Sequence, residues 1–101
     1  MPDWNAEDLL ISRDRLRVSN HALREAHKEG LRAKDIFYAL FHGKIVEQYP
    51  DRQRVLIVGP ARKASVPVHV VCDYADPHEL VAVTVYIPNR PDWLTAQIRS
   101  H

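Results

Sequence analysis

With 101 residues, the chain has room for one hydrophobic core, and we expect a single domain over residues 1–101. Apolar residues make up 46% and charged residues 27% of the chain, a mixture typical of globular domains rather than disordered or fibrous chains. The 14 basic and 13 acidic residues give a formal charge of +1, so the chain lacks the overall basic excess of strong nucleic-acid binders.

The single cysteine, Cys72, lies in an apolar run, and no CxxC or Cys/His zinc pattern occurs in the sequence. We therefore expect a buried thiol, a cytoplasmic location, and neither a metal nor another cofactor. The N-terminus lacks a basic region followed by an apolar stretch, and every apolar run is far shorter than a membrane span. Neither a signal peptide nor a membrane segment is expected.

The first part of the chain shows helical periodicity. An amphipathic helix is predicted over about residues 3–15. A second helix is predicted to begin after Ser19, which is a favourable N-cap, and to end at Gly30. A third is predicted over residues 33–42 and ends at Gly43. The last two helices are joined by a very short turn, so we expect them to pack as neighbours.

After the third helix the period changes to that of β-strands. The short connections favour an antiparallel meander of three to four strands with the N-terminal helices on one face, which is an α+β fold. A short helix from Asp92 onward is also expected. The predicted strands are rich in β-branched residues and bounded by turn residues: Lys44 to Tyr49, Arg54 to Gly59, Val66 to Tyr74 and Leu80 to Ile87.

The alternation along the last two strands predicts which side chains share a face. We expect the helices to cover the face that carries Val68, Val70, Val83 and Val85. The opposite face then carries His69, Thr84 and Tyr86. His69 lies opposite either Thr84 or Tyr86, depending on the register. In both cases His69 and Tyr86 lie on one face, close enough to cooperate.

An ordered set of motifs covers most of the chain: Ser19-Asn-His-Ala-Leu-Arg-Glu-Ala-His-Lys-Glu-Gly30, His42-Gly-Lys-Ile-Val-Glu-Gln-Tyr-Pro50, Val55-Leu-Ile-Val-Gly59, Val66-Pro-Val-His-Val-Val71 and Thr84-Val-Tyr-Ile-Pro88, with Trp93 shortly after. From about residue 18 to 93, the chain resembles the prokaryotic domain-of-unknown-function family four-two-five-eight. The resemblance implies a fold related to RelE- and BrnT-type toxins, many of which cut messenger RNA with a helix pair packed on a curved antiparallel sheet. Many members carry arginine where this chain has Glu25, so an activity that needs that arginine is not implied here.

Toxin-type RNA cleavage without a metal needs little machinery. One group takes the proton from the 2′-hydroxyl, another donates to the leaving 5′-oxygen, and cations stabilise the charged phosphorane. The catalytic candidates in this sequence are His69, Tyr86 and His21. The nucleic-acid-binding candidates are the basic residues Arg52, Arg54, Arg62, Lys63 and Arg90.

Structural interpretations of the same residues remain open. A histidine in an apolar strand commonly satisfies its nitrogens with neighbours, here Thr84 or Glu47, and the basic residues are also compatible with a solvated hairpin rim. We therefore carry two hypotheses. The first is a toxin-like nucleic-acid-acting protein, in its fullest form a metal-independent endoribonuclease that acts on RNA. The second is a non-catalytic interaction module that uses the same fold to bind an antitoxin-like protein or itself. Small-ligand binding is a third class.

Overall fold

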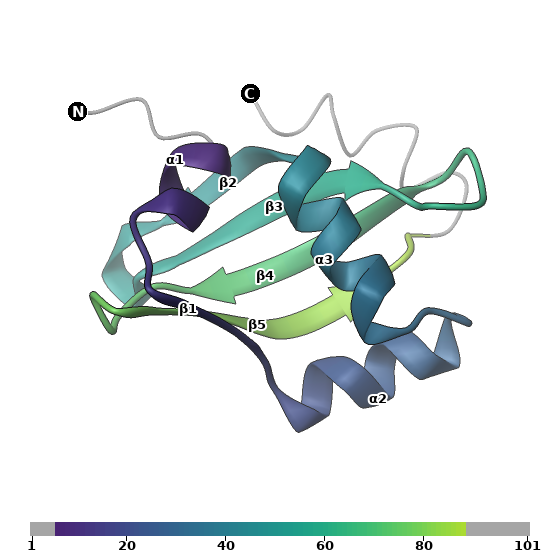
Figure 1. The fold of residues 1–101 in the computed structure, drawn as a ribbon, viewed down its shortest axis with the longest axis horizontal. Coiled ribbons are helices and arrows are strands. Elements are labelled where there is room, and N and C mark those ends of the chain that lie inside the picture. Colours follow the sequence, from purple (N-terminus) through teal and green to yellow (C-terminus); the bar gives the residue numbers. More distant parts are fainter. Residues whose placement is uncertain (1–5, 89–101) are drawn as a thin grey trace.

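The computed structural model describes residues 6–88, which form an α+β domain with one five-stranded sheet (Figure 1). The strand order in the sheet is β1-β5-β4-β3-β2. None of the helices in this part of the chain is long and apolar enough to span a membrane. The elements in chain order are α1 (Ala6–Ile11), β1 (Arg15–Val18), α2 (Asn20–Lys28), α3 (Ala33–His42), β2 (Lys44–Tyr49), the 3-10 turn η1 (Pro50–Arg52), β3 (Arg54–Pro60), β4 (Pro67–Asp73) and β5 (Glu79–Tyr86).

Helices α2 and α3 begin and end where their capping residues predict. The Ser19 hydroxyl accepts a hydrogen bond of 3.0 Å from the backbone N–H of Ala22, as an N-cap does. After α2 the chain turns at Gly30, whose φ of +77° is in the left-handed region that favours glycine. At the start of α3, the Asp35 carboxylate accepts a 2.8 Å hydrogen bond from the backbone N–H of Arg32.

The first helix is shorter than predicted, and the sheet is mixed rather than a purely antiparallel meander. α1 ends at Ile11, and by Arg15 the chain has become strand β1, which pairs in parallel with β5. Leu16 and Val18 pack against the core while their neighbours Arg15 and Arg17 are exposed, so this segment has the period of a strand. The expected antiparallel order holds for β2 to β5. The predicted helix from Asp92 lies outside the described residues.

A β-bulge changes which residues of β5 face the helices. The ladder pairs Val71 with Thr84 and Cys72 with Ala82, so that Val83 is the extra residue of the bulge. Ala82 and Val85 are both fully buried, whereas Val83 is only half-buried. The prediction that Val83 shares the covered face with Val85 was therefore wrong, because the bulge shifts the alternation by one residue.

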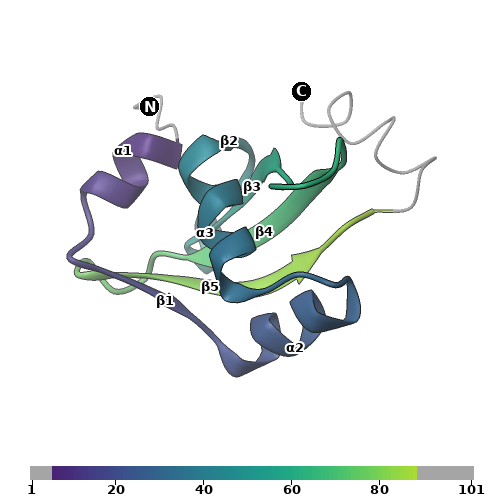
Figure 2. The same ribbon diagram turned by 45° about the vertical axis from the view of Figure 1, so that its right-hand side comes forward.

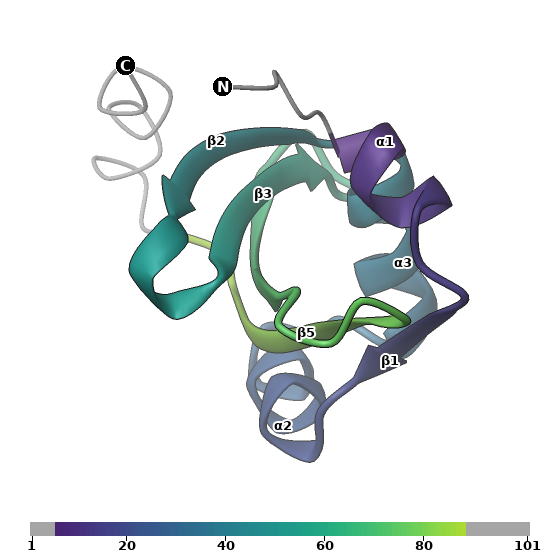
Figure 3. The same ribbon diagram turned by 90° about the vertical axis from the view of Figure 1, so that its left-hand side faces the viewer.

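The core lies between the helices and the face of the sheet that is turned towards them, called the inner face below. Figures 1 and 2 show α3 lying across the sheet and α2 alongside β5, and Figure 3 shows the sheet curving around α3. Ile36 and Leu40 of α3 pack there with Val70 of β4. Cys72 also lies in this core, where burial raises the pKa of its thiol to about 12. The thiol is therefore a small apolar core group, as predicted.

Helix α3 lies close against the sheet at Gly59. A Cβ atom at this position would overlap the backbone of Ala39, including its carbonyl oxygen. Glycine is required here because the backbone of α3 occupies the space that a side chain would take.

Candidate nucleic-acid interface

The β4–β5 ladder places His69 directly opposite Tyr86 on the face of the sheet turned away from the helices, the outer face. The Nδ1 atom of His69 lies 3.2 Å from the Tyr86 hydroxyl oxygen, within hydrogen-bond distance. The two rings are tilted by 46° with their centroids 4.9 Å apart. The prediction that these side chains lie together is confirmed, and of the two open registers the structure has the one with Tyr86 opposite His69.

The pair is not open to a substrate in this arrangement. His69 is 1% exposed, although the sheet face that carries it is turned away from α2 and α3. A general base must come within hydrogen-bond reach of the hydroxyl that it deprotonates. The geometry therefore supports a structural hydrogen bond across the ladder more directly than a catalytic one.

The third catalytic candidate, His21, does not join this pair. It is exposed on α2, and the neighbouring Ala22 packs into the core on the inner face. His69 and Tyr86 lie on the outer face, so the sheet separates them from α2. The three candidates do not converge on one centre.

The basic residues that were predicted to bind nucleic acid are divided between the two ends of β3. Arg54 begins β3 and pairs with Asp73 at 3.2 Å, with Arg52 beside it in η1. Arg62 and Lys63 follow the other end of β3. The strand has 7 residues, which at about 3.3 Å per residue puts roughly 20 Å between its ends. Arg90 lies outside the described residues.

Arg62 and Lys63 belong to a larger set of residues that line one groove, which we call the basic groove. This groove of about 400 Å³ runs between the start of α3 and the β3–β4 connection. Among the residues that the structure describes, its basic side chains are those of Arg32, Lys34, Arg62 and Lys63, and its carboxylates are those of Glu29 and Asp35. Leu31, Ala61, Val66 and Ile87 are among its apolar lining residues.

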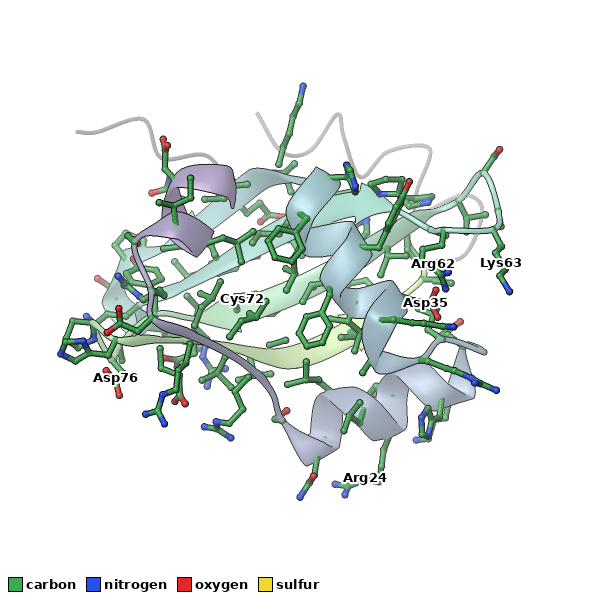
Figure 4. The ribbon with its side chains drawn as sticks, in the orientation of Figure 1. Arg24, Asp35, Arg62, Lys63, Cys72 and Asp76 are labelled. Carbon is green, nitrogen blue, oxygen red and sulfur yellow. The ribbon has the colours of Figure 1, made fainter. Side chains whose placement is uncertain are left out.

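One cation of the basic groove is held in place by an ion pair. The Arg62 guanidinium donates to the Asp35 carboxylate at 3.2 Å, and Figure 4 shows the two side chains next to each other. The backbone N–H of Arg32 also donates to this carboxylate and lowers the pKa of Asp35; Arg62 and Lys34 act in the same direction, and burial opposes them. The ionised carboxylate thus fixes Arg62, while Lys63 extends from the connection into solvent (Figure 4).

Arg32 and Lys34 were missed as candidates because no local signal connects them with Arg62 and Lys63. They stand at the start of α3, whereas Arg62 and Lys63 stand in a connection between strands. Only the packing of α3 on the sheet brings the two pairs to one groove. Glu25 forms an ion pair of 3.2 Å with Lys28 within α2. Residues 6–88 contain no group of three or more His, Cys, Asp or Glu side chains arranged to hold a metal ion.

The comparisons with known proteins agree with the motifs. A family model described as Domain of unknown function (DUF4258) matches residues 18–87, from the last residue of β1 to just beyond β5. No curated protein and no solved structure matches the chain.

Proposed function

This chain belongs to the DUF4258 family of domains of unknown function, and we propose that it is a nucleic-acid-binding protein whose basic groove holds phosphates of single-stranded RNA. The observation that carries this proposal is that, among the residues that the structure describes, four basic residues and only two acidic ones line one groove. Lysine and arginine contacts to phosphates supply most of the affinity in sequence-independent binding. The formal charge of +1 does not oppose this function, because the cations are concentrated locally.

The size of the groove favours a single strand. A groove of about 400 Å³ cannot enclose a duplex, whereas a flexible single strand can bend to place a phosphate there. The positive end of the α3 dipole lies at the same place and adds to the attraction for phosphate.

The test is binding of a fluorescently labelled oligouridine of about 12 nucleotides, followed by anisotropy over a range of salt concentrations. Each phosphate contact to a single strand contributes about −0.7 to the slope of log affinity against log salt. Lys34→Gln and Lys63→Gln should each weaken binding and each flatten the slope by about that amount.

Arg24→Gln is the matched control, because it removes one exposed positive charge from α2, away from the groove (Figure 4). We expect this variant to bind as the unchanged protein does. Binding that does not depend on salt, or an equal loss for Arg24→Gln and Lys63→Gln, would contradict the proposal.

Cleavage is the stronger form of this proposal, as in a toxin-like endoribonuclease, and it is tested with the same RNA. We place binding first because His69 is 1% exposed. Cleavage that is lost in both His69→Ala and Tyr86→Phe, with binding retained, would assign the pair a catalytic role. Intact RNA after long incubation with saturating protein leaves binding as the function.

A protein-interaction module is the second candidate, and it is favoured by a different surface. Ile11 of α1 is 73% exposed and Phe41 of α3 is 62% exposed. Tyr38 lies one turn before Phe41 on α3 and is 37% exposed. Exposed apolar side chains on adjoining helices are common at protein contact sites. If this surface joins two copies, light scattering should show a concentration-dependent dimer that Phe41→Ser disrupts; a monomer at all concentrations would reject self-association.

A further inference from the structure

A second groove, separate in character from the basic groove, lies beside the first residues of β2. It runs between this strand and the β3–β4 connection and has a volume of about 570 Å³. Sites for small organic molecules typically have volumes of about 300–1,000 Å³. We call it the valine groove, because Val46, Val58 and Val66 line it together with Pro60 and Pro67.

The ionisable side chains of the valine groove, among the described residues, are basic. None of the lining residues that the structure describes is acidic, and Lys44 and His42 supply the basic groups. The Lys44 side chain is exposed and forms no ion pair with any residue of the part of the chain that the structure describes. The groove thus combines apolar walls with an available positive charge.

The walls of this groove are set by the fold. Lys44 and Val58 are paired across the β2–β3 ladder, and Val46 is the extra residue where the register of that ladder shifts. Gly59, also in the lining, is held against the backbone of Ala39 in α3. The site is therefore formed by paired strands and a packed helix before any ligand enters.

We propose that the valine groove binds an aliphatic monocarboxylate of the fatty-acid type. The alkyl chain lies against Val46, Val58 and Val66, and the carboxylate is attracted by the Lys44 ammonium group. One compact ammonium group matches the single charge of a monocarboxylate, whereas a phosphate monoester carries a charge of about −1.5 to −2 and needs more than one cation to balance it. The inference does not depend on RNA binding, because Lys34 and Lys63 do not line this groove.

The test is calorimetric titration of the full chain with hexanoate, octanoate and decanoate below their micellar concentrations. Burial of each added methylene should raise the affinity by up to about fourfold until the groove is filled. Amide shifts in a titration followed by nuclear magnetic resonance should be largest at residues 44–46, 58–59 and 64–66. Shifts confined to other residues, or no saturable binding, would overturn the proposal.

The role of the positive charge is tested with Lys44→Gln and Lys44→Glu. Loss of a half-solvated ion pair should weaken octanoate binding by about twofold to fivefold in Lys44→Gln, with a larger loss in Lys44→Glu. Binding of uncharged octanol should be unchanged in Lys44→Gln. Lys63→Gln is the control, because it removes the same charge from the basic groove, and it should bind octanoate normally. Equal octanoate affinity in Lys44→Glu and the unchanged protein would overturn the proposal.

A short apolar peptide with a free C-terminal carboxylate tests the other source of this chemistry. If the peptide binds at the same residues more tightly than decanoate, and its amidated form does not, the assignment to a fatty-acid-type ligand is overturned in favour of a peptide C-terminus. Weaker binding of the peptide supports the assignment.

Discussion

The Nδ1 atom of His69 lies 3.2 Å from the hydroxyl oxygen of Tyr86, and this contact joins β4 to β5 on the outer face of the sheet. His69 is the one polar side chain among the fully buried residues of the described part of the chain. A buried polar group is costly unless it is hydrogen-bonded. The contact therefore has a structural purpose whether or not the pair also acts on a substrate.

The first prediction concerns this contact. Tyr86→Phe removes the hydroxyl group and keeps the ring, and we expect the free energy of unfolding to fall by about 1 kcal/mol. Tyr38→Phe is the control, since Tyr38 is 37% exposed and its ring packs on His42. Urea unfolding measures both. Equal small effects in the two variants would show that the His69 contact does not stabilise the fold.

The second prediction compares two glycines that are required for different reasons: the close approach of a backbone at Gly59 and the positive φ at Gly30. Gly59→Ala forces a methyl group into the backbone of Ala39, so the strand or α3 must move, and we expect a loss of about 3 kcal/mol in the free energy of unfolding. Gly30→Ala meets no atom within 4 Å and is strained only by its φ of +77°. The expected loss there is about 1 kcal/mol. Gly30→Asn should recover part of it, because asparagine tolerates this conformation. A smaller loss at Gly59 than at Gly30 would contradict the close approach.

The third prediction concerns the reactivity of Cys72. With the pKa of its thiol raised to about 12, about one group in ten thousand is ionised at pH 8. The thiolate is the reactive form, and the side chain is fully buried, so a disulfide reagent should modify Cys72 only as fast as the fold opens. The measurement is the release of a chromogenic thiol with and without urea. Rapid stoichiometric reaction of the native protein would contradict the packing.

The fourth prediction is a dependence of stability on pH through Asp35. Its pKa is lowered in the folded state, chiefly by the backbone N–H of Arg32. The stabilisation is therefore fully present above the unfolded pKa of about 3.9 and is lost as the pH falls through the lower folded pKa. Asp35→Asn should be less stable than the unchanged protein at pH 7, and this difference should shrink towards pH 3.

Arg62→Gln provides the companion measurement, since the Arg62 guanidinium is bonded to the same carboxylate. The double variant should lose less free energy of unfolding than the sum of the losses of the two single variants, because each substitution removes the same ion pair. If the two losses simply add at pH 7, the ion pair makes no contribution to the free energy of unfolding.

The features that were predicted correctly are those that depend on local signals. Ser19 and Gly30 mark the ends of α2 through their own capping chemistry, and no distant residue is needed to recognise them. That His69 and Tyr86 share a face follows from alternation along two neighbouring strands, whereas alternation left open whether Thr84 or Tyr86 lies opposite His69.

The features that were missed depend on contacts between distant segments. The parallel pairing of β1 leaves a four-residue signal that an adjacent helical pattern obscured, and one bulge reversed the alternation at Val83. The basic groove exists only because the start of α3 lies against the connection that carries Arg62. No motif or residue spacing in the sequence predicts that contact.

The pairing of β1 with β5 also determines when the sheet can be completed during synthesis of the chain. Arg15 lies opposite Glu79 in the parallel ladder, so the first strand has no partner until the last strand has left the ribosome. The capped helices α2 and α3 can form early, whereas closure of the sheet must wait for a contact of long sequence separation, which is the slow kind. We therefore expect nascent chains that stop before Glu79 to remain sensitive to proteases across β1.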